Sequence, residues 1–161
     1  MLENVKSGLE GQQFLITGEE NLSKGLENNK KVFGEKWNTI GFKDATSVHF
    51  CSLVFNQEVF NLNMDWSILC PFKLVVYNMK ARPDQIFILT ARPTYLLKDD
   101  AHKKAPEIGK KMEDRIIRAV MEGALAACPA SGGRPARGQG PCSARSAVTR
   151  ARPAVTLARR A

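Results

Sequence analysis

The apolar run Ile86-Phe-Ile-Leu89 constrains the fold more than any other stretch of the chain. It is too short for a helix, it is flanked by polar residues, and it stops at Thr90 and Pro93. A short apolar run with such boundaries is typical of a strand that is buried on both faces. We therefore expect residues 86–89 to form the central strand of a sheet.

Other stretches predict the remaining elements. Residues 1–11 and the segment from Pro106 past Met121 carry apolar residues at helical spacing, and so do residues 19–37 despite two glycines. Residues 13–17 predict a first strand. The strand-forming runs 48–55 and 58–62 flank Asn56-Gln57 and predict a hairpin, with His49 facing outward.

Residues 71–81 fit two structures. A helix that starts at Pro71 and ends before Arg82-Pro83 is the one we favour. A strand over 72–77 is the alternative, and the β-branched pair Val75-Val76 supports it. With either structure the fold class is α/β, a small layered mixed sheet with flanking helices that is compatible with an incomplete domain.

The C-terminal stretch has a different composition from the body. Seven arginines and no acidic residue lie between positions 127 and 161, so this stretch carries +7 of the net charge of +8. Its other residues are mainly Ala, Gly, Pro and Ser, which cannot bury enough surface to fold alone. We expect a domain over 1–126 and a disordered tail over 127–161. Nonspecific electrostatic binding of nucleic acid or an acidic partner is predicted for its arginines: Arg134, Arg137, Arg145, Arg150, Arg152, Arg159 and Arg160.

Several classes of protein are disfavoured. No apolar run approaches the roughly 18–20 residues of a membrane span, so we expect no membrane association. The first ten residues lack a basic segment followed by an apolar one, which predicts a cytoplasmic protein, with a nuclear location as the alternative. Disulfides are then unexpected among the four cysteines. His49, Cys51 and Cys70 lack the second close ligand pair that a zinc site needs.

Residues 84–93 resemble the second motif of haloacid-dehalogenase-like (HAD) phosphatases, in which a buried strand ends in Thr or Ser, often followed by Ala, Arg and Pro. The resemblance implies that Thr90 and Arg92 bind phosphate at the edge of a parallel sheet. Asp99 and Asp100 then imitate the acidic motif that holds Mg²⁺, the one cofactor implied. The Asp-x-Asp nucleophile motif of that family is absent from the chain.

The sequence therefore favours a non-catalytic domain that acts through an unknown protein partner and needs no cofactor, as a truncated or alternative isoform would. A divergent HAD-like phosphohydrolase or phosphate-binding fragment is the alternative, and nucleic-acid binding by the basic tail is a further one.

Overall fold

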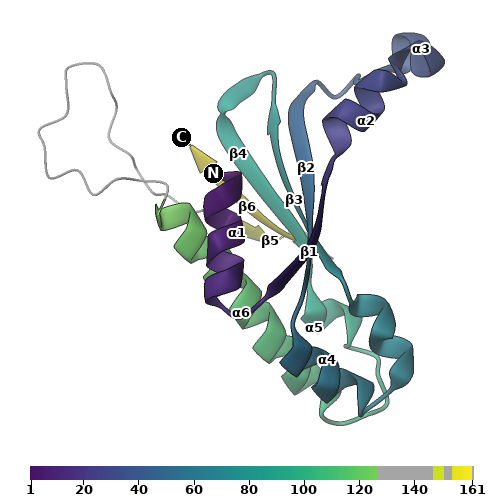
Figure 1. Ribbon diagram of the computed structural model, residues 1–161, viewed down its shortest axis with the longest axis vertical. Coiled ribbons are helices and arrows are strands. Elements are labelled where there is room, and N and C mark those ends of the chain that lie inside the picture. The colour runs from purple at the N-terminus through teal and green to yellow at the C-terminus, as the bar shows by residue number, and fades with distance from the viewer. Residues whose placement is uncertain (127–146, 151–153, 161) are drawn as a thin grey trace, which may run out of the picture.

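The computed structural model describes residues 1–126, 147–150 and 154–160, with backbone only in the last two ranges (Figure 1). The elements are α1 Leu2–Gly11, β1 Leu15–Asn21, α2 Leu22–Asn28, α3 Lys30–Phe33, the 3₁₀ turn η1 Gly34–Lys36, β2 Phe42–Cys51, α4 Leu53–Phe60, the 3₁₀ turn η2 Met64–Leu69, β3 Phe72–Met79, β4 Arg82–Ala91, α5 Pro93–Leu96, α6 Ala105–Ala126, β5 Ala147–Arg150 and β6 Ala154–Arg160.

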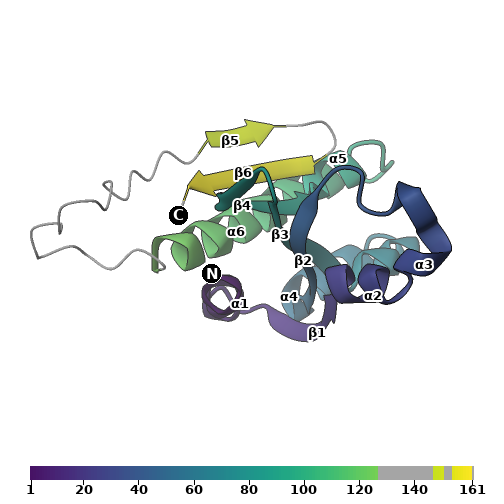
Figure 2. The ribbon, with the colours of Figure 1, turned by 90° about the horizontal axis from the view of Figure 1, so that it is seen from above.

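The predicted α/β class, with a layered sheet and flanking helices, is confirmed. The strand order is β1-β2-β3-β4-β6-β5, and each neighbouring pair is antiparallel. Figure 2 shows β6 and β5 continuing the sheet beyond β4. Within the described residues no helix is both long and apolar enough to span a membrane.

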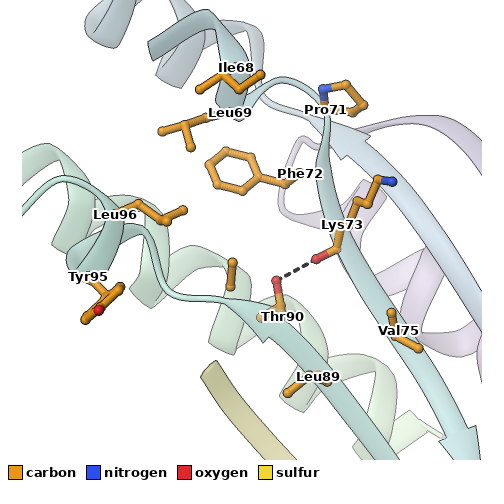
Figure 3. Close-up of a pocket in the computed structure, with 11 residues that line it drawn as sticks. Ile68, Leu69, Pro71, Phe72, Lys73, Val75, Leu89, Thr90, Tyr95 and Leu96 are labelled. Atoms are coloured by element: carbon orange, nitrogen blue, oxygen red, sulfur yellow. Dashed lines mark hydrogen bonds between the residues drawn. The ribbon is translucent and has the colours of Figure 1, made fainter. Parts of the chain in front are cut away.

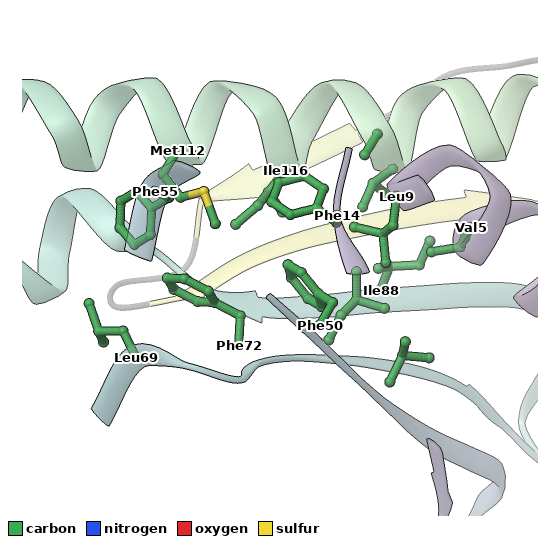
Figure 4. Close-up of a cluster of buried hydrophobic side chains, with 14 of the residues drawn as sticks. Val5, Leu9, Phe14, Phe50, Phe55, Leu69, Phe72, Ile88, Met112 and Ile116 are labelled. Carbon is green, nitrogen blue, oxygen red and sulfur yellow. The ribbon is translucent and has the colours of Figure 1, made fainter. Parts of the chain in front are cut away.

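The core lies between one face of the sheet and the helices α1 and α6. Phe50 of β2, Leu74 of β3 and Ile88 of β4 are buried and alternate with residues of the other face. Figure 4 shows Phe50 and Ile88 on the side of the sheet that faces α6. The ring of Phe50 lies 5.2 Å from that of Phe14 and 5.9 Å from that of Phe72, measured between centroids. These side chains join the start of β1, the end of β2 and the start of β3 into one apolar cluster.

Because α1 and α6 cover only one face of the sheet, the run at residues 86–89 is less buried than its sequence predicts. Ile88 is buried, whereas Ile86, Phe87 and Leu89 are only half-buried. Phe87 and Leu89 pair with Tyr77 and Val75 on the face opposite α1 and α6. The rings of Phe87 and Tyr77 stack with centroids 5.0 Å apart, which shields both from water.

The α1 and α6 helices cross at closest approach where each carries a glycine. A Cβ on Gly8 would collide with the carbonyl oxygen of Ala119, and a Cβ on Gly123 would collide with that of Asn4. The absence of side chains at these two positions lets α1 lie directly on α6. Val5 and Leu9 are then fully buried beside them.

Two predicted elements are wrong between β2 and β4. Residues 53–60 form α4 rather than half of a hairpin, because the Ser52 side chain caps the helix by accepting from the backbone N–H of Phe55, 3.4 Å away. Phe55 and Val59, one helical turn apart, are its buried face. Residues 72–79 form the strand β3, so the favoured helix is wrong and the alternative, a strand over 72–77, is confirmed; β2 and β4 supply hydrogen-bonding partners on both of its sides.

The long helix predicted over residues 19–37 is also wrong. Its first residues extend β1, and the rest divides into α2, α3 and η1, none of which has a buried residue. Gly34 breaks the pattern, because its φ of +56° lies in the left-handed region that interrupts a right-handed helix. Figure 1 shows α2 and α3 projecting away from the rest of the domain.

Two predictions about Cys and His side chains need correction. Cys51 and Cys70 form a disulfide, which the sequence did not predict. They are 19 residues apart in the chain, but the pairing of Phe50 with Phe72 brings their strand ends together. His49 lies on the outer face of the sheet, as its alternation with Phe50 predicts, but it is half-buried, and its Nε2 is buried with no hydrogen-bond partner within the described part of the chain.

The C-terminal stretch contains two strands that its composition did not predict. The backbone of β6 pairs with the outer edge of β4, from Gln85 opposite Arg160 to Ala91 opposite Ala154. A free sheet edge offers unpaired N–H and C=O groups, so it can order a segment whose own side chains form no core. The structure does not describe residues 127–146, 151–153 and 161.

We predict that Gly123→Ala destabilises the fold by roughly 1–3 kcal/mol or more, because the added methyl group forces α1 away from α6. Chemical denaturation followed by circular dichroism measures the free energy of unfolding. Gly25→Ala in α2 is the matched control, since its Cβ would meet no atom within 4 Å. It should leave stability unchanged or raise it by about 0.5–1 kcal/mol. Equal stability of Gly123→Ala and the parent would contradict the close crossing.

Candidate functional site

A cavity with a mainly apolar lining lies where β3 and β4 separate, and its volume is about 510 Å³. Ile68 and Leu69 of η2 form one wall, and Tyr95 and Leu96 of α5 form the opposite one (Figure 3). The strands between them contribute the remaining wall residues, which include Phe72, Val75, Leu89 and Ala91. We call this cavity the β3–β4 pocket. Its volume falls within the range of roughly 300–1,000 Å³ that is typical of small-molecule sites.

The pocket exists because the two strands stop pairing before they end. The last β3–β4 pair is Leu74 with Thr90. Beyond it, β3 continues beside β2 as far as the pair Phe72 and Phe50. On the other side, β4 keeps its pairing with β6 as far as its last residue, Ala91, and the chain then turns at Pro93 into α5. The gap between the diverging chains is the pocket.

Thr90 closes the inner end of this gap. Its side chain is 8% exposed, and its hydroxyl donates to the backbone carbonyl of Lys73 over 2.9 Å (Figure 3). Lys73 precedes Leu74, the last residue of β3 that pairs with β4, so it has no paired residue on β4. Thr90 therefore satisfies a backbone group at the point of separation.

Arg92 draws the end of β4 towards α6. Its Nε donates to Oε1 of Glu113 over 3.0 Å, and the two side chains are 23% and 11% exposed. The other carboxylate oxygen of Glu113 accepts from both the backbone N–H and the hydroxyl of Thr94. One buried carboxylate thus fixes the turn from β4 into α5.

Asp99 and Asp100 lie after α5, outside the pocket lining. Asp99 pairs with the adjacent Lys98, at 3.5 Å. Asp100 accepts from the indole N–H of Trp66 over 2.5 Å and from the backbone N–H of His102 over 2.7 Å. These hydrogen bonds, the indole one first, hold the pKa of Asp100 below its ordinary value. Among the described residues, no three His, Cys, Asp or Glu side chains are placed to share a metal ion.

The basic residues predicted to bind nucleic acid cannot be placed as side chains. Arg134, Arg137, Arg145 and Arg152 lie outside the described residues, and Arg150, Arg159 and Arg160 lie in strands of which only the backbone is described. Nucleic-acid binding by the tail stays a prediction.

The pocket has few polar groups, and Lys73 carries its one charge. In Figure 3 the side chain of Lys73 extends from β3 on the outer side, away from Phe72 and from the opposite wall at Leu96. Tyr95 is the other titratable lining residue; the Nζ of Lys98 lies 4.5 Å from its ring centroid. The lining contains no carboxylate and no histidine.

Sequence reasoning missed most of this site. Only Thr90 among the predicted site residues lines the pocket, and it does so as a structural hydroxyl. The walls come from η2, which we left unassigned, and from β3, which we expected to be a helix. Phe72-Lys-Leu-Val-Val-Tyr77 did carry a signal, because its polar residue alternates with apolar ones as in a half-exposed strand.

Comparison with known proteins decides the family. The model of a family described as "Domain of unknown function DUF302" matches residues 1–122. The chain belongs to the DUF302 family. Its fold is similar to the crystal structure of an uncharacterized conserved DUF302 protein from Bacillus stearothermophilus, with a TM-score of 0.61 and 20% identity over 75% of this chain and 86% of that one. No curated protein matches the chain.

Membership of DUF302 shows that the resemblance to HAD phosphatases is wrong. The structure gives the physical reason: β1 and β4 are separated by two strands and run in opposite directions, whereas the resemblance implied a parallel sheet. Thr90 is also buried and bonded to Lys73. The sequence pattern Thr-Ala-Arg-Pro in this DUF302 chain serves the separation of β4 from β3 and its turn towards α6.

We predict that Glu113→Gln destabilises the domain by about 2 kcal/mol. The NH₂ group of the new amide is a hydrogen-bond donor, and it faces the donor groups of Arg92 or Thr94, which then lose an acceptor. Arg92 also loses its counter-ion. The cost stays below that of a fully buried pair because Arg92 is 23% exposed. Thermal and chemical unfolding measure it.

Asp114→Asn is the matched control on the neighbouring helix position. The Lys110–Asp114 pair is 71% and 50% exposed, so its loss should cost less than about 0.5 kcal/mol. If both variants lose equally little stability, the Glu113 carboxylate does not fix the turn from β4 into α5.

Proposed function

We propose that this DUF302 domain is a binding module whose β3–β4 pocket takes up a small apolar ligand. The observation that carries the proposal is an open cavity of about 510 Å³ with a predominantly aliphatic and aromatic lining. Removing apolar surface from water is the main source of affinity for such a site, at roughly 25 cal/mol per Å². An open cavity of this size with an apolar lining has the usual form of a small-molecule site, which favours a binding role.

The polar groups of the lining support binding rather than a reaction. General acid–base catalysis requires titratable groups that face the reacting atoms. Lys73 and Tyr95 are the titratable lining residues, and they come from different walls. The Thr90 hydroxyl already donates to a backbone carbonyl. These features support a non-catalytic domain.

The walls of the pocket are held by contacts outside it, which suits a preformed site. The Cys51–Cys70 disulfide ties the end of η2 to β2. Asn56 of α4 donates to Sγ of Cys70 over 3.1 Å, and the indole of Trp66 in η2 bonds to Asp100. On the opposite wall, Glu113 fixes the start of α5. A preorganised site loses less entropy when a ligand binds.

Binding is tested with N-phenyl-1-naphthylamine, an uncharged probe that fluoresces in apolar surroundings. We expect saturable enhancement with the parent protein. Ala91→Trp places an indole in the pocket and should weaken binding at least tenfold, about 1.4 kcal/mol. Ala101→Trp is the matched control, because Ala101 is an exposed alanine outside the lining and should bind as the parent does. No saturable signal from the parent, or equal affinity of Ala91→Trp, would refute the proposal.

A further inference from the structure

If the proposed function holds, the positive charge of Lys73 at the β3–β4 pocket indicates which class of apolar ligand it binds. We infer that the pocket binds a single-chain amphiphile with a monoanionic head, a fatty acid, whose chain lies between η2 and α5 and whose carboxylate pairs with Lys73. This assignment goes beyond uptake of an apolar ligand, because it specifies the polar end of the ligand and the residue that recognises it.

Polarity is unevenly distributed along the pocket. The inner walls are apolar, from Leu69 and Phe72 on one side to Leu96 on the other. Lys73 and Val75 share the outer face of β3, since they are two residues apart on one strand. Lys73 is exposed, and a lysine at such an edge can lay its stem along apolar surface while its ammonium stays in water. A ligand with one apolar end and one anionic end matches this arrangement.

Lys73 has no counter-ion in the described part of the chain. None of the ion pairs there includes Lys73. Its cross-strand neighbours on the same face are His49 of β2 and Ala91, which follows Thr90 on β4. No carboxylate lines the pocket that would repel an anionic head.

The single ammonium at the pocket sets the charge of the ligand's head. One ammonium can neutralise one negative charge, so a dianionic phosphate would keep an uncompensated charge beside an apolar wall. Lys98, beside the opposite wall, lies over the ring of Tyr95 and pairs with Asp99. A carboxylate is therefore the head that this rim fits.

The test compares decanoate with decanol, which share the chain and differ in the charge of the head. Each displaces N-phenyl-1-naphthylamine from the full chain below its own aggregation concentration. We expect both to bind, with decanoate roughly three- to tenfold tighter, about 0.7–1.4 kcal/mol. The advantage of decanoate should shrink as salt is raised, whereas the affinity for decanol should not fall.

Lys73→Met keeps an unbranched apolar stem and removes the charge. It should abolish the preference for decanoate while decanol still binds. Lys80→Met is the matched control: Lys80 is exposed at the far end of the same hairpin, and the preference should persist. Thermal unfolding verifies that both variants fold.

The outcomes separate the two proposals. Equal affinity of the parent for decanoate and decanol, or a preference that survives Lys73→Met, overturns the fatty-acid assignment and leaves the apolar binding site intact. Failure of both ligands and of the uncharged probe overturns the proposed function itself, and the fatty-acid assignment with it.

Discussion

The close crossing of α1 and α6 is the constraint on which the rest of the structure depends. Only one face of the β1–β4 sheet is covered by long helices, so the core depends on how closely they approach each other and the strands. Gly8 and Gly123 allow that approach, and Val5 and Leu9 complete the core beside them. With α6 fixed in this way, Glu113 on the same helix stands where it can hold Arg92 at the end of β4. The packing of the core at one end of α6 and the geometry of the pocket at the other are therefore linked through one rigid helix.

The pocket is the result of two attachments that pull in different directions. The start of β3 stays in the sheet, because it pairs with β2 and because Cys70 is bonded to Cys51. The end of β4 is drawn to α6 by the Arg92–Glu113 pair. The Cys51–Cys70 bond and the Arg92–Glu113 pair lie outside the cavity, so the residues that hold its walls apart are not part of its lining. That separation of structural polar contacts from an apolar lining is what makes the site suitable for a ligand with a long apolar part.

The sequence predicted the elements whose signal is local and missed those that depend on distant partners. The helices α1 and α6 show apolar residues at helical spacing along their own length, and both were predicted close to their observed bounds. The residues of β3 fit a helix as well as a strand, and its place between β2 and β4 decides its structure. Ser52 could have marked the start of α4, but the run of strand-forming residues before it was the stronger local pattern. The Cys51–Cys70 bond and the pocket walls are contacts between strand ends far apart in sequence, and no single stretch encodes them.

Thr90 shows why one motif can suggest the wrong chemistry. In a parallel sheet, strand ends gather at one edge, and a hydroxyl there meets loops and helix starts that bind anions. In an antiparallel sheet, neighbouring strands end at opposite edges, so a terminal hydroxyl meets the beginning of its neighbour instead. Here that neighbour is β3, and its Lys73 carbonyl is the group that needs a donor. Lys73 also lines the pocket, and its side chain extends on the outer side of β3. One residue thus uses its backbone to anchor the end of β4 and, in our proposal, its ammonium to select the ligand.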